Sequence, residues 1–179
     1  MMTNTPVTAV GDEITVLYGT ETGNGMRVSK RLWQQLEAAG LHARWLNTGK
    51  YRLPELSRER CLLVAISTYD DEQPPEDALG FMGFLMSSKA PRLLQLRYGV
   101  LALGATCYSA FCTVGLTLDA RLAELGATRL VHVGLCDTEF ERVATPWIAN
   151  TTRVVSETFG VSALLSGRHA IVDRADVDG

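Results

Sequence analysis

Short apolar runs alternate with amphipathic stretches along most of the chain. Five of these runs have the length and apolar character of strands: residues 14–17, 43–46, 61–66, 100–103 and 130–135. Strands that are apolar on both faces are typical of a parallel sheet covered on both sides. The pattern therefore predicts an α/β fold in which a five-stranded parallel sheet is buried between helices.

Apolar residues at helical spacing occupy the segments between these strands. The first such segment carries Val28, Leu32 and Leu36 on one helical face. Three further helices are expected at about residues 76–87, 111–125 and 140–158. Because crossovers between parallel strands are right-handed, this order predicts a doubly wound sheet. Five strands with one crevice for a ligand favour the strand order 2-1-3-4-5.

Composition and charge narrow the class of protein. The chain has 179 residues, of which 46% are hydrophobic and 21% are charged, which suits one domain with a sizeable core. The formal net charge of −3 argues against nucleic acid as a partner, and no apolar run is long enough to cross a membrane. We expect one domain over residues 13–160, with a flexible N-terminal tail at 1–12 and a C-terminal tail at 161–179.

The cysteines and the N-terminus bear on the compartment. The first dozen residues lack the basic start and apolar core of a signal peptide. Four scattered cysteines do not form a disulfide framework, so we expect free thiols in a reducing cytoplasm. Cys107, Cys112 and Cys136 have too few neighbouring ligands for zinc or an iron–sulfur cluster, and no metal site is expected.

The most informative segment follows the first strand, where residues 18–25 read YGTETGNG. Hydroxyl, glycine and asparagine residues on a strand-to-helix turn offer hydrogen-bond donors where a helix N-terminus attracts an anion. The segment lacks both the Gly-Lys-Ser/Thr ending of a Walker loop and the three-glycine spacing of a dinucleotide fingerprint. It therefore favours a site for one terminal phosphate, although an ordinary capped turn would also fit this segment alone.

Two further loops carry aromatic side chains. Ligands of open α/β sheets bind outside the carboxyl ends of the strands, so these loops are the next candidates. Tyr69 follows the third strand and Tyr108 follows the fourth, each a few residues beyond the strand end. An isolated loop tyrosine is usually an ordinary packed residue. Two of them facing a phosphate loop are what a planar ring with a phosphate tail requires.

Together these motifs resemble the flavodoxin-like FMN domain of diflavin reductases, over about residues 14–155. The resemblance is strongest to the sulfite reductase flavoprotein and next to cytochrome P450 reductase. It implies a flavodoxin-like fold, FMN as cofactor, and electron transfer rather than conversion of a substrate by catalytic residues. By this resemblance residues 20–25 hold the phosphate, Tyr69 and Tyr108 cover the two ring faces, and backbone groups at the strand ends meet the polar edge. The implied cofactor site consists of Thr20, Glu21, Thr22, Gly23, Asn24, Gly25, Ser67, Thr68, Tyr69, Asp70, Leu103, Gly104, Ala105, Thr106, Cys107, Tyr108, Phe111, Cys112 and Asp137.

Three positions depart from the usual pattern of this family. Asp70 and Glu72 stand where the family has glycines after the first aromatic residue, and Ala105 stands where it has an acidic or polar residue. These departures imply shifted redox potentials, weaker FMN binding or loss of the flavin. The charges of this loop, which continue to Glu76 and Asp77, predict either an acidic rim for basic partners or an ordinary solvated face.

The length of the chain shapes the expected function. About 20 residues after the last helix cannot hold the second flavin and nicotinamide domains of a diflavin reductase. We therefore expect a one-electron carrier that links a separate flavin- and NAD(P)H-dependent reductase to a separate redox protein. One alternative is a degenerate domain without flavin that serves as a protein-interaction module. Another is a flavoenzyme that oxidises a nicotinamide or reduces a small molecule itself.

Overall fold

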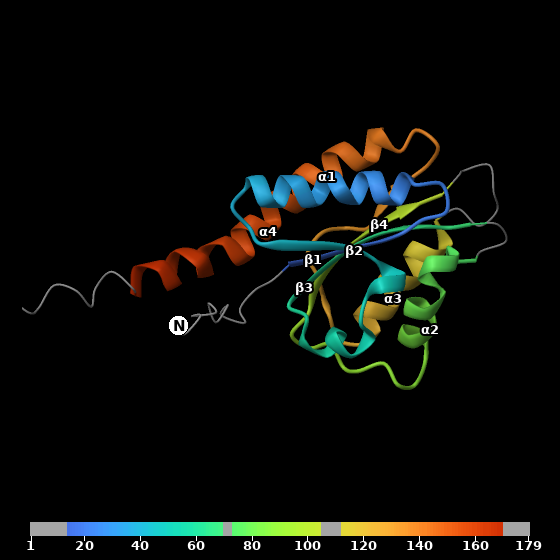
Figure 1. Ribbon diagram of the computed structural model, residues 1–179, viewed down its shortest axis with the longest axis horizontal. Coiled ribbons are helices and arrows are strands. Elements are labelled where there is room, and N and C mark those ends of the chain that lie inside the picture. Colours follow the sequence, from blue (N-terminus) through green and yellow to red (C-terminus); the bar gives the residue numbers. More distant parts are fainter. Residues whose placement is uncertain (1–13, 70–72, 105–111, 170–179) are drawn as a thin grey trace, which may run out of the picture.

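The computed structural model describes residues 14–69, 73–104 and 112–169, so the expected N-terminal tail lies outside them. All strand pairs in it are parallel, in the order β2-β1-β3-β4-β5, with β6 also paired to β4. This arrangement confirms the predicted sheet (Figure 1). The strands are β1 (Ile14–Gly19), β2 (Ala43–Asn47), β3 (Cys61–Ser67), β4 (Arg97–Leu103), β5 (Thr128–Arg129) and β6 (Gly134–Cys136).

The fifth strand was predicted at residues 130–135, but the structure has two short strands there: β5 lies just before this range and β6 overlaps only its end. β5 pairs with the start of β4 and β6 pairs with its end, so the described residues form six strands rather than five. Between them, the carbonyl oxygen of His132 accepts a hydrogen bond from the indole N–H of Trp147 at 3.0 Å. A side chain from a later helix thus takes a backbone acceptor of this segment, which the apolar run alone could not indicate.

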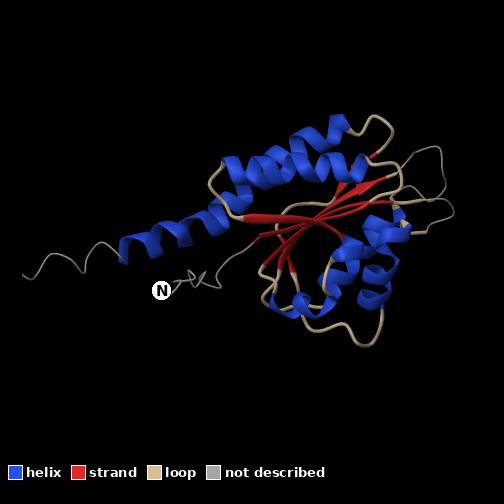
Figure 2. Cartoon of the chain, in the orientation of Figure 1, coloured by secondary structure: helices blue, strands red, loops and turns tan. Residues whose placement is uncertain are grey.

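Helices cover both faces of the sheet (Figure 2). On one side lie α1 (Asn24–Ala38) and α4 (Glu141–His169), and on the other lie α2 (Leu79–Met86) and α3 (Thr113–Glu124). The described residues also form three short 3-10 helices, η1 (Thr48–Lys50), η2 (Leu53–Arg58) and η3 (Glu76–Ala78). Among the described helices, none combines the length and the apolar character that crossing a membrane would require.

Helix α4 is longer than the sequence pattern predicts. It continues to His169 instead of ending near Thr158, so residues 161–169, expected in the C-terminal tail, are helical. Residues 161–165 read VSALL, and alanine and leucine are strong helix formers, which explains the continuation. In Figure 1 this last part of α4 extends beyond the sheet.

Two hydrophobic cores lie on opposite sides of the sheet. Leu63 and Ala65 of β3 enter the core under α1 and α4, whereas Leu62 and Val64 enter the core under α2 and α3. Because strand side chains alternate between faces, a strand that is buried on both sides reads as a continuous apolar run. This is the physical origin of the pattern from which the sheet was predicted.

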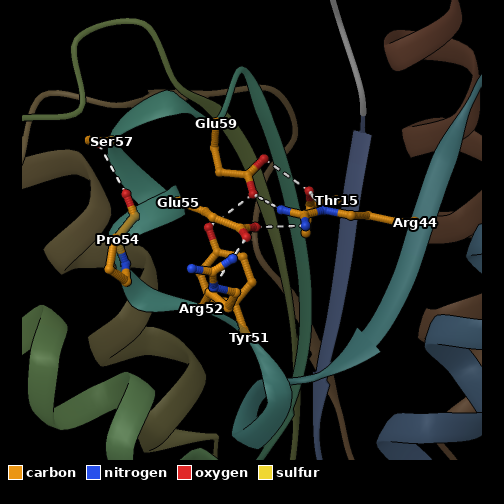
Figure 3. A network of polar contacts seen from close by, with 8 residues as sticks. All are labelled: Thr15, Arg44, Tyr51, Arg52, Pro54, Glu55, Ser57 and Glu59. Carbon is orange, nitrogen blue, oxygen red and sulfur yellow. Dashed lines mark hydrogen bonds and ion pairs between the residues drawn. The ribbon is translucent and has the colours of Figure 1, made fainter. Parts of the chain in front are cut away.

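Polar side chains close the amino end of the sheet (Figure 3). Glu59, which is 8% exposed, accepts hydrogen bonds from the hydroxyls of Thr15 and Tyr51, both at 2.9 Å. Arg44 pairs with Glu59 at 2.5 Å and with Glu55 at 2.7 Å. The charges of this cluster are thus paired with one another. Ligands of open α/β sheets bind at the carboxyl end, which is therefore the place to look for a ligand site.

Candidate cofactor site

The loop between β1 and α1 has the geometry of an anion site. Gly23 is the N-cap of α1 and has a φ of 89°, a left-handed conformation that glycine adopts without strain. Its N–H donates to the hydroxyl of Thr20 at 2.9 Å, which closes a tight turn. In the described part of the chain no side chain caps α1, so its first N–H groups can serve an anion.

Small residues let this loop lie close to its neighbours. A Cβ atom at Gly25 would lie 3.0 Å from the carbonyl oxygen of Gly19. A Cβ atom at Gly19 would lie 2.9 Å from that of Ala78, so a larger residue at either position would displace the loop. The first turn of α1 carries no acidic side chain that would repel an anion. These residues therefore fit a phosphate group.

Two carboxylates connect η3 to the loop of residues 20–25 before α1, which we call the phosphate loop after the ligand proposed for it. The backbone N–H of Thr20 donates to both carboxylate oxygens of Asp77, at 3.1 and 3.3 Å. The backbone N–H of Glu76 donates in turn to the carboxylate of Glu21 at 2.9 Å. Asp77 therefore faces the phosphate loop and does not form part of a solvated acidic rim. Its position was not recognised from the sequence, because its partners lie in a distant segment.

Tyr69 lies just beyond β3 and is 52% exposed. Its backbone N–H donates to the carbonyl of Gln73 at 2.9 Å, and its carbonyl accepts from the N–H of Gln73 at 3.2 Å. This pair of hydrogen bonds closes the loop at its base and leaves an exposed aromatic ring at the carboxyl edge of the sheet. Such a ring can cover one face of a planar ligand.

Hydrogen bonds also fix the ends of β3, β4 and β6 to one another. The N–H of Thr68 donates to the carbonyl of Leu103, and the N–H of Gly104 donates to the carbonyl of Cys136, both at 2.8 Å. The hydroxyl of Thr68 accepts from the N–H of Val114 at 3.0 Å, in the first turn of α3. These groups hold the loop bases in place, and their contact with a ligand ring stays a prediction.

Cys112 lies at the start of α3, next to the ends of β4 and β6. It is the N-cap of α3 with a φ of 55°, and its buried thiol lies 3.3 Å from the carbonyl oxygen of Ala102. Burial raises the pKa of the Cys112 thiol to about 11 and that of Cys136 to about 12. Both thiols are therefore protonated at neutral pH, which suits structural rather than reactive cysteines.

The described residues of the predicted site gather at one edge. Residues 20–25 follow β1, Ser67 ends β3 and Asp137 follows β6. The carboxylate of Asp137 accepts the N–H of Glu139 at 2.9 Å, so it shapes the turn before α4. The predicted site residues Asp70, Ala105, Thr106, Cys107, Tyr108 and Phe111 lie outside the described residues.

Comparison with known proteins identifies the family. Residues 16–147 match the family model described as flavodoxin, and the chain therefore belongs to the flavodoxin family. FMN is the cofactor of this family, so membership agrees with the cofactor expected from the sequence. Membership also supports a role in electron transfer with FMN.

Curated relatives include flavoprotein alpha-components of NADPH-dependent sulfite reductase. The protein from Shewanella sp. (strain MR-7) is 37% identical over 150 residues, which cover 84% of this chain and 25% of the relative. That from Bacillus subtilis (strain 168) is 36% identical over 158 residues, or 88% of this chain and 26% of the relative. The chain thus spans about a quarter of the length of these relatives.

Solved flavodoxin structures have the same fold. A mutant of the flavodoxin from Pseudomonas aeruginosa superposes with a TM-score of 0.70 at 24% identity, covering 80% of this chain and 99% of that chain. A short-chain flavodoxin associated with a bacterial microcompartment has a TM-score of 0.68 at 22% identity, covering 82% and 97%. These likenesses agree with the predicted doubly wound sheet.

Proposed function

We propose that this chain binds FMN at the carboxyl edge of its sheet and carries electrons between two redox partners. The donor is a separate NAD(P)H-dependent flavin reductase, and the acceptor is a separate redox protein. The observation that carries the proposal is the loop before α1, where left-handed Gly23 and an uncapped helix N-terminus offer N–H groups to a phosphate.

Different residues of the site would bind the phosphate and the ring of the cofactor. Bound FMN supplies the one-electron chemistry that the side chains of a protein lack. Residues 20–25 would hold the phosphate through N–H groups and hydroxyls, and the dipole of α1 favours its negative charge. Tyr69 would cover one ring face and keep water from it. Because Tyr69 is half exposed, this edge stays within reach of a partner protein.

Titration of the apoprotein with FMN, FAD and riboflavin tests the cofactor. We expect FMN to bind most tightly, with strong quenching of its fluorescence by the stacked tyrosine. Thr22→Val should weaken FMN about tenfold or more, because a hydrogen bond to a charged group contributes about 1.5–3 kcal/mol. Thr128→Val removes an exposed hydroxyl at the start of β5 and should leave the affinity unchanged.

The other outcomes of this titration separate the alternatives. If FAD or riboflavin binds as tightly as FMN, the assignment of the phosphate loop is wrong. If no flavin binds, the proposed function is wrong and the alternative of a protein-interaction module is favoured.

A second experiment tests the transfer of electrons. The FMN-loaded protein is mixed with NADPH alone, or with NADPH and a flavin reductase, and ferricytochrome c serves as the acceptor probe. We expect rapid reduction of cytochrome c only when reductase and FMN-loaded protein are both present. Rapid oxidation of NADPH by the protein alone would instead favour the flavoenzyme alternative.

A further inference from the structure

The phosphate loop and η3 exchange hydrogen bonds in both directions. Thr20 donates its N–H to the carboxylate of Asp77, while Glu76 donates its N–H to the carboxylate of Glu21. We call these two contacts the reciprocal clamp, formed by the backbone N–H groups of Thr20 and Glu76 and the carboxylates of Glu21 and Asp77. Because η3 follows directly on the loop that carries Tyr69, the clamp joins two of the segments proposed to hold FMN.

Asp77 is held in place by other elements of the fold. The side-chain amide of Asn47 donates to its carboxylate at 2.6 Å, and the hydroxyl of Thr48 donates to its backbone carbonyl at 2.9 Å. Asn47 is itself fixed, because its side-chain oxygen Oδ1 caps η1 by accepting the N–H of Gly49 at 2.8 Å. The end of β2 therefore sets the position of the carboxylate that receives the N–H of Thr20.

We propose that Asp77 and Glu21 are positioning residues that hold the phosphate loop in its binding geometry before a ligand arrives, and that they thereby favour phosphorylated flavin. This inference rests on the proposed function. A loop that is already ordered loses less conformational freedom when it binds, and the affinity rises accordingly. Only a ligand whose phosphate contacts the loop gains from this order. The clamp should therefore increase the preference for FMN over riboflavin.

The same carboxylates also oppose binding through their charge. Each is negative and belongs to the loop or to a segment in contact with it, so it repels a phosphate dianion. The half-buried Asp77 should have the larger effect, because solvent screens the exposed Glu21. The hydrogen bond and the charge thus act in opposite directions. An amide side chain separates them, since it retains an acceptor oxygen but carries no charge.

The test compares Asp77→Ala, Asp77→Asn and Glu76→Ala with the wild-type protein. The control Glu76→Ala removes an exposed carboxylate from the same segment but keeps the backbone N–H of the clamp. FMN and riboflavin are titrated separately against each apoprotein, and the unfolding of each is followed in urea. Glu21→Ala provides a second break of the clamp at an exposed position if Asp77→Ala does not fold.

We expect Asp77→Ala to weaken FMN about tenfold and to leave riboflavin nearly unchanged, so the ratio of the two affinities falls. Asp77→Asn should bind FMN more tightly than Asp77→Ala, because its oxygen can still accept the N–H of Thr20. Glu76→Ala should bind FMN at least as tightly as the wild type. Glu21→Ala should weaken FMN in the same direction as Asp77→Ala, by a smaller factor.

Three outcomes would overturn the inference. Equal losses for FMN and riboflavin in Asp77→Ala would show that Asp77 supports only the fold. Unchanged FMN binding in Asp77→Ala and Glu21→Ala would show that the clamp does not position the loop, while the proposed function would stand. A wild-type protein that binds no FMN would remove the proposed function, and the inference with it.

Discussion

The same substitution at two glycines should change stability in opposite directions. Gly23 lies in the phosphate loop with a φ of 89°, whereas Gly83 lies within α2. A Cβ atom would meet nothing within 4 Å at either position. Gly23→Ala and Gly83→Ala therefore differ in the backbone conformation that alanine must adopt, and not in steric contacts.

The expected magnitudes follow from that conformation. An L-residue in the left-handed region costs about 1–2 kcal/mol, and replacing glycine lowers the entropy of the unfolded chain by about 0.4–1 kcal/mol in the opposite direction. Gly23→Ala should therefore lower the free energy of unfolding by about 1 kcal/mol. Gly83→Ala should raise it by about 0.5–1 kcal/mol, because glycine is the weaker helix former.

The affinity for FMN gives a second measure of the backbone strain in the Gly23→Ala variant. If the phosphate loop of the Gly23→Ala variant relaxes in the free protein, FMN must restore the original turn, and its affinity falls by the energy that the relaxation released. The loss of stability and the loss of affinity should then add up to about 1 kcal/mol, the strain less the entropy gained by restricting the unfolded chain. Urea denaturation of the apoproteins and FMN titration measure the two parts. If both variants are stabilised equally, Gly23 is not left-handed and this reasoning is refuted.

Two further predictions concern groups away from the site. Burial raises the pKa of Tyr98 to about 12, and burial with the charge of Glu59 raises the pKa of Tyr51 as well. Because unfolded tyrosine ionises near pH 10, this stabilisation is present below about pH 10 and is lost as the pH rises toward the higher folded values. The free energy of unfolding should thus fall between about pH 9 and pH 12, and less steeply in Tyr51→Phe; an equal slope in both proteins would contradict this. The hydroxyl of Thr151 is fully buried and has no hydrogen-bond partner among the described residues. Thr151→Val should raise the free energy of unfolding by about 1 kcal/mol, as measured in urea. Thr152→Val, which removes a hydroxyl that donates to the carbonyl of Ile148 at 2.8 Å, should not, and a loss of stability at 151 would show that its hydroxyl does have a partner.

Features that depend on neighbouring residues could be predicted from the sequence. The strands β1, β3 and β4 are buried on both faces, and their apolar runs are visible without knowledge of the fold. The turn from β1 into α1 is encoded within residues 18–25, where glycine and hydroxyl residues meet the start of a helical pattern. The buried strands and the turn from β1 into α1 were therefore accessible from local patterns.

Features that depend on distant residues could not be predicted in this way. The break between β5 and β6 involves Trp147, which belongs to the following helix. Cys112 adopts a left-handed conformation although it is not a glycine, and its thiol contacts the carbonyl oxygen of Ala102 at the end of β4. In both cases the irregular backbone coincides with a tertiary contact that no pattern of neighbouring residues reports.

Carboxylates at the two ends of the sheet have different hydrogen-bond partners. Glu59 at the amino end and Asp77 at the carboxyl end are both carboxylates that collect donors from several segments. Glu59 takes a cation and two hydroxyls, which neutralises it and ties strands together. Asp77 takes a backbone N–H and an amide, and among the described residues no cation pairs with it beside the loop that would receive a phosphate. A carboxylate beside a phosphate site increases the affinity for FMN only if the order imposed by its hydrogen bonds outweighs its repulsion of the phosphate. The comparison of Asp77→Asn with Asp77→Ala measures that balance.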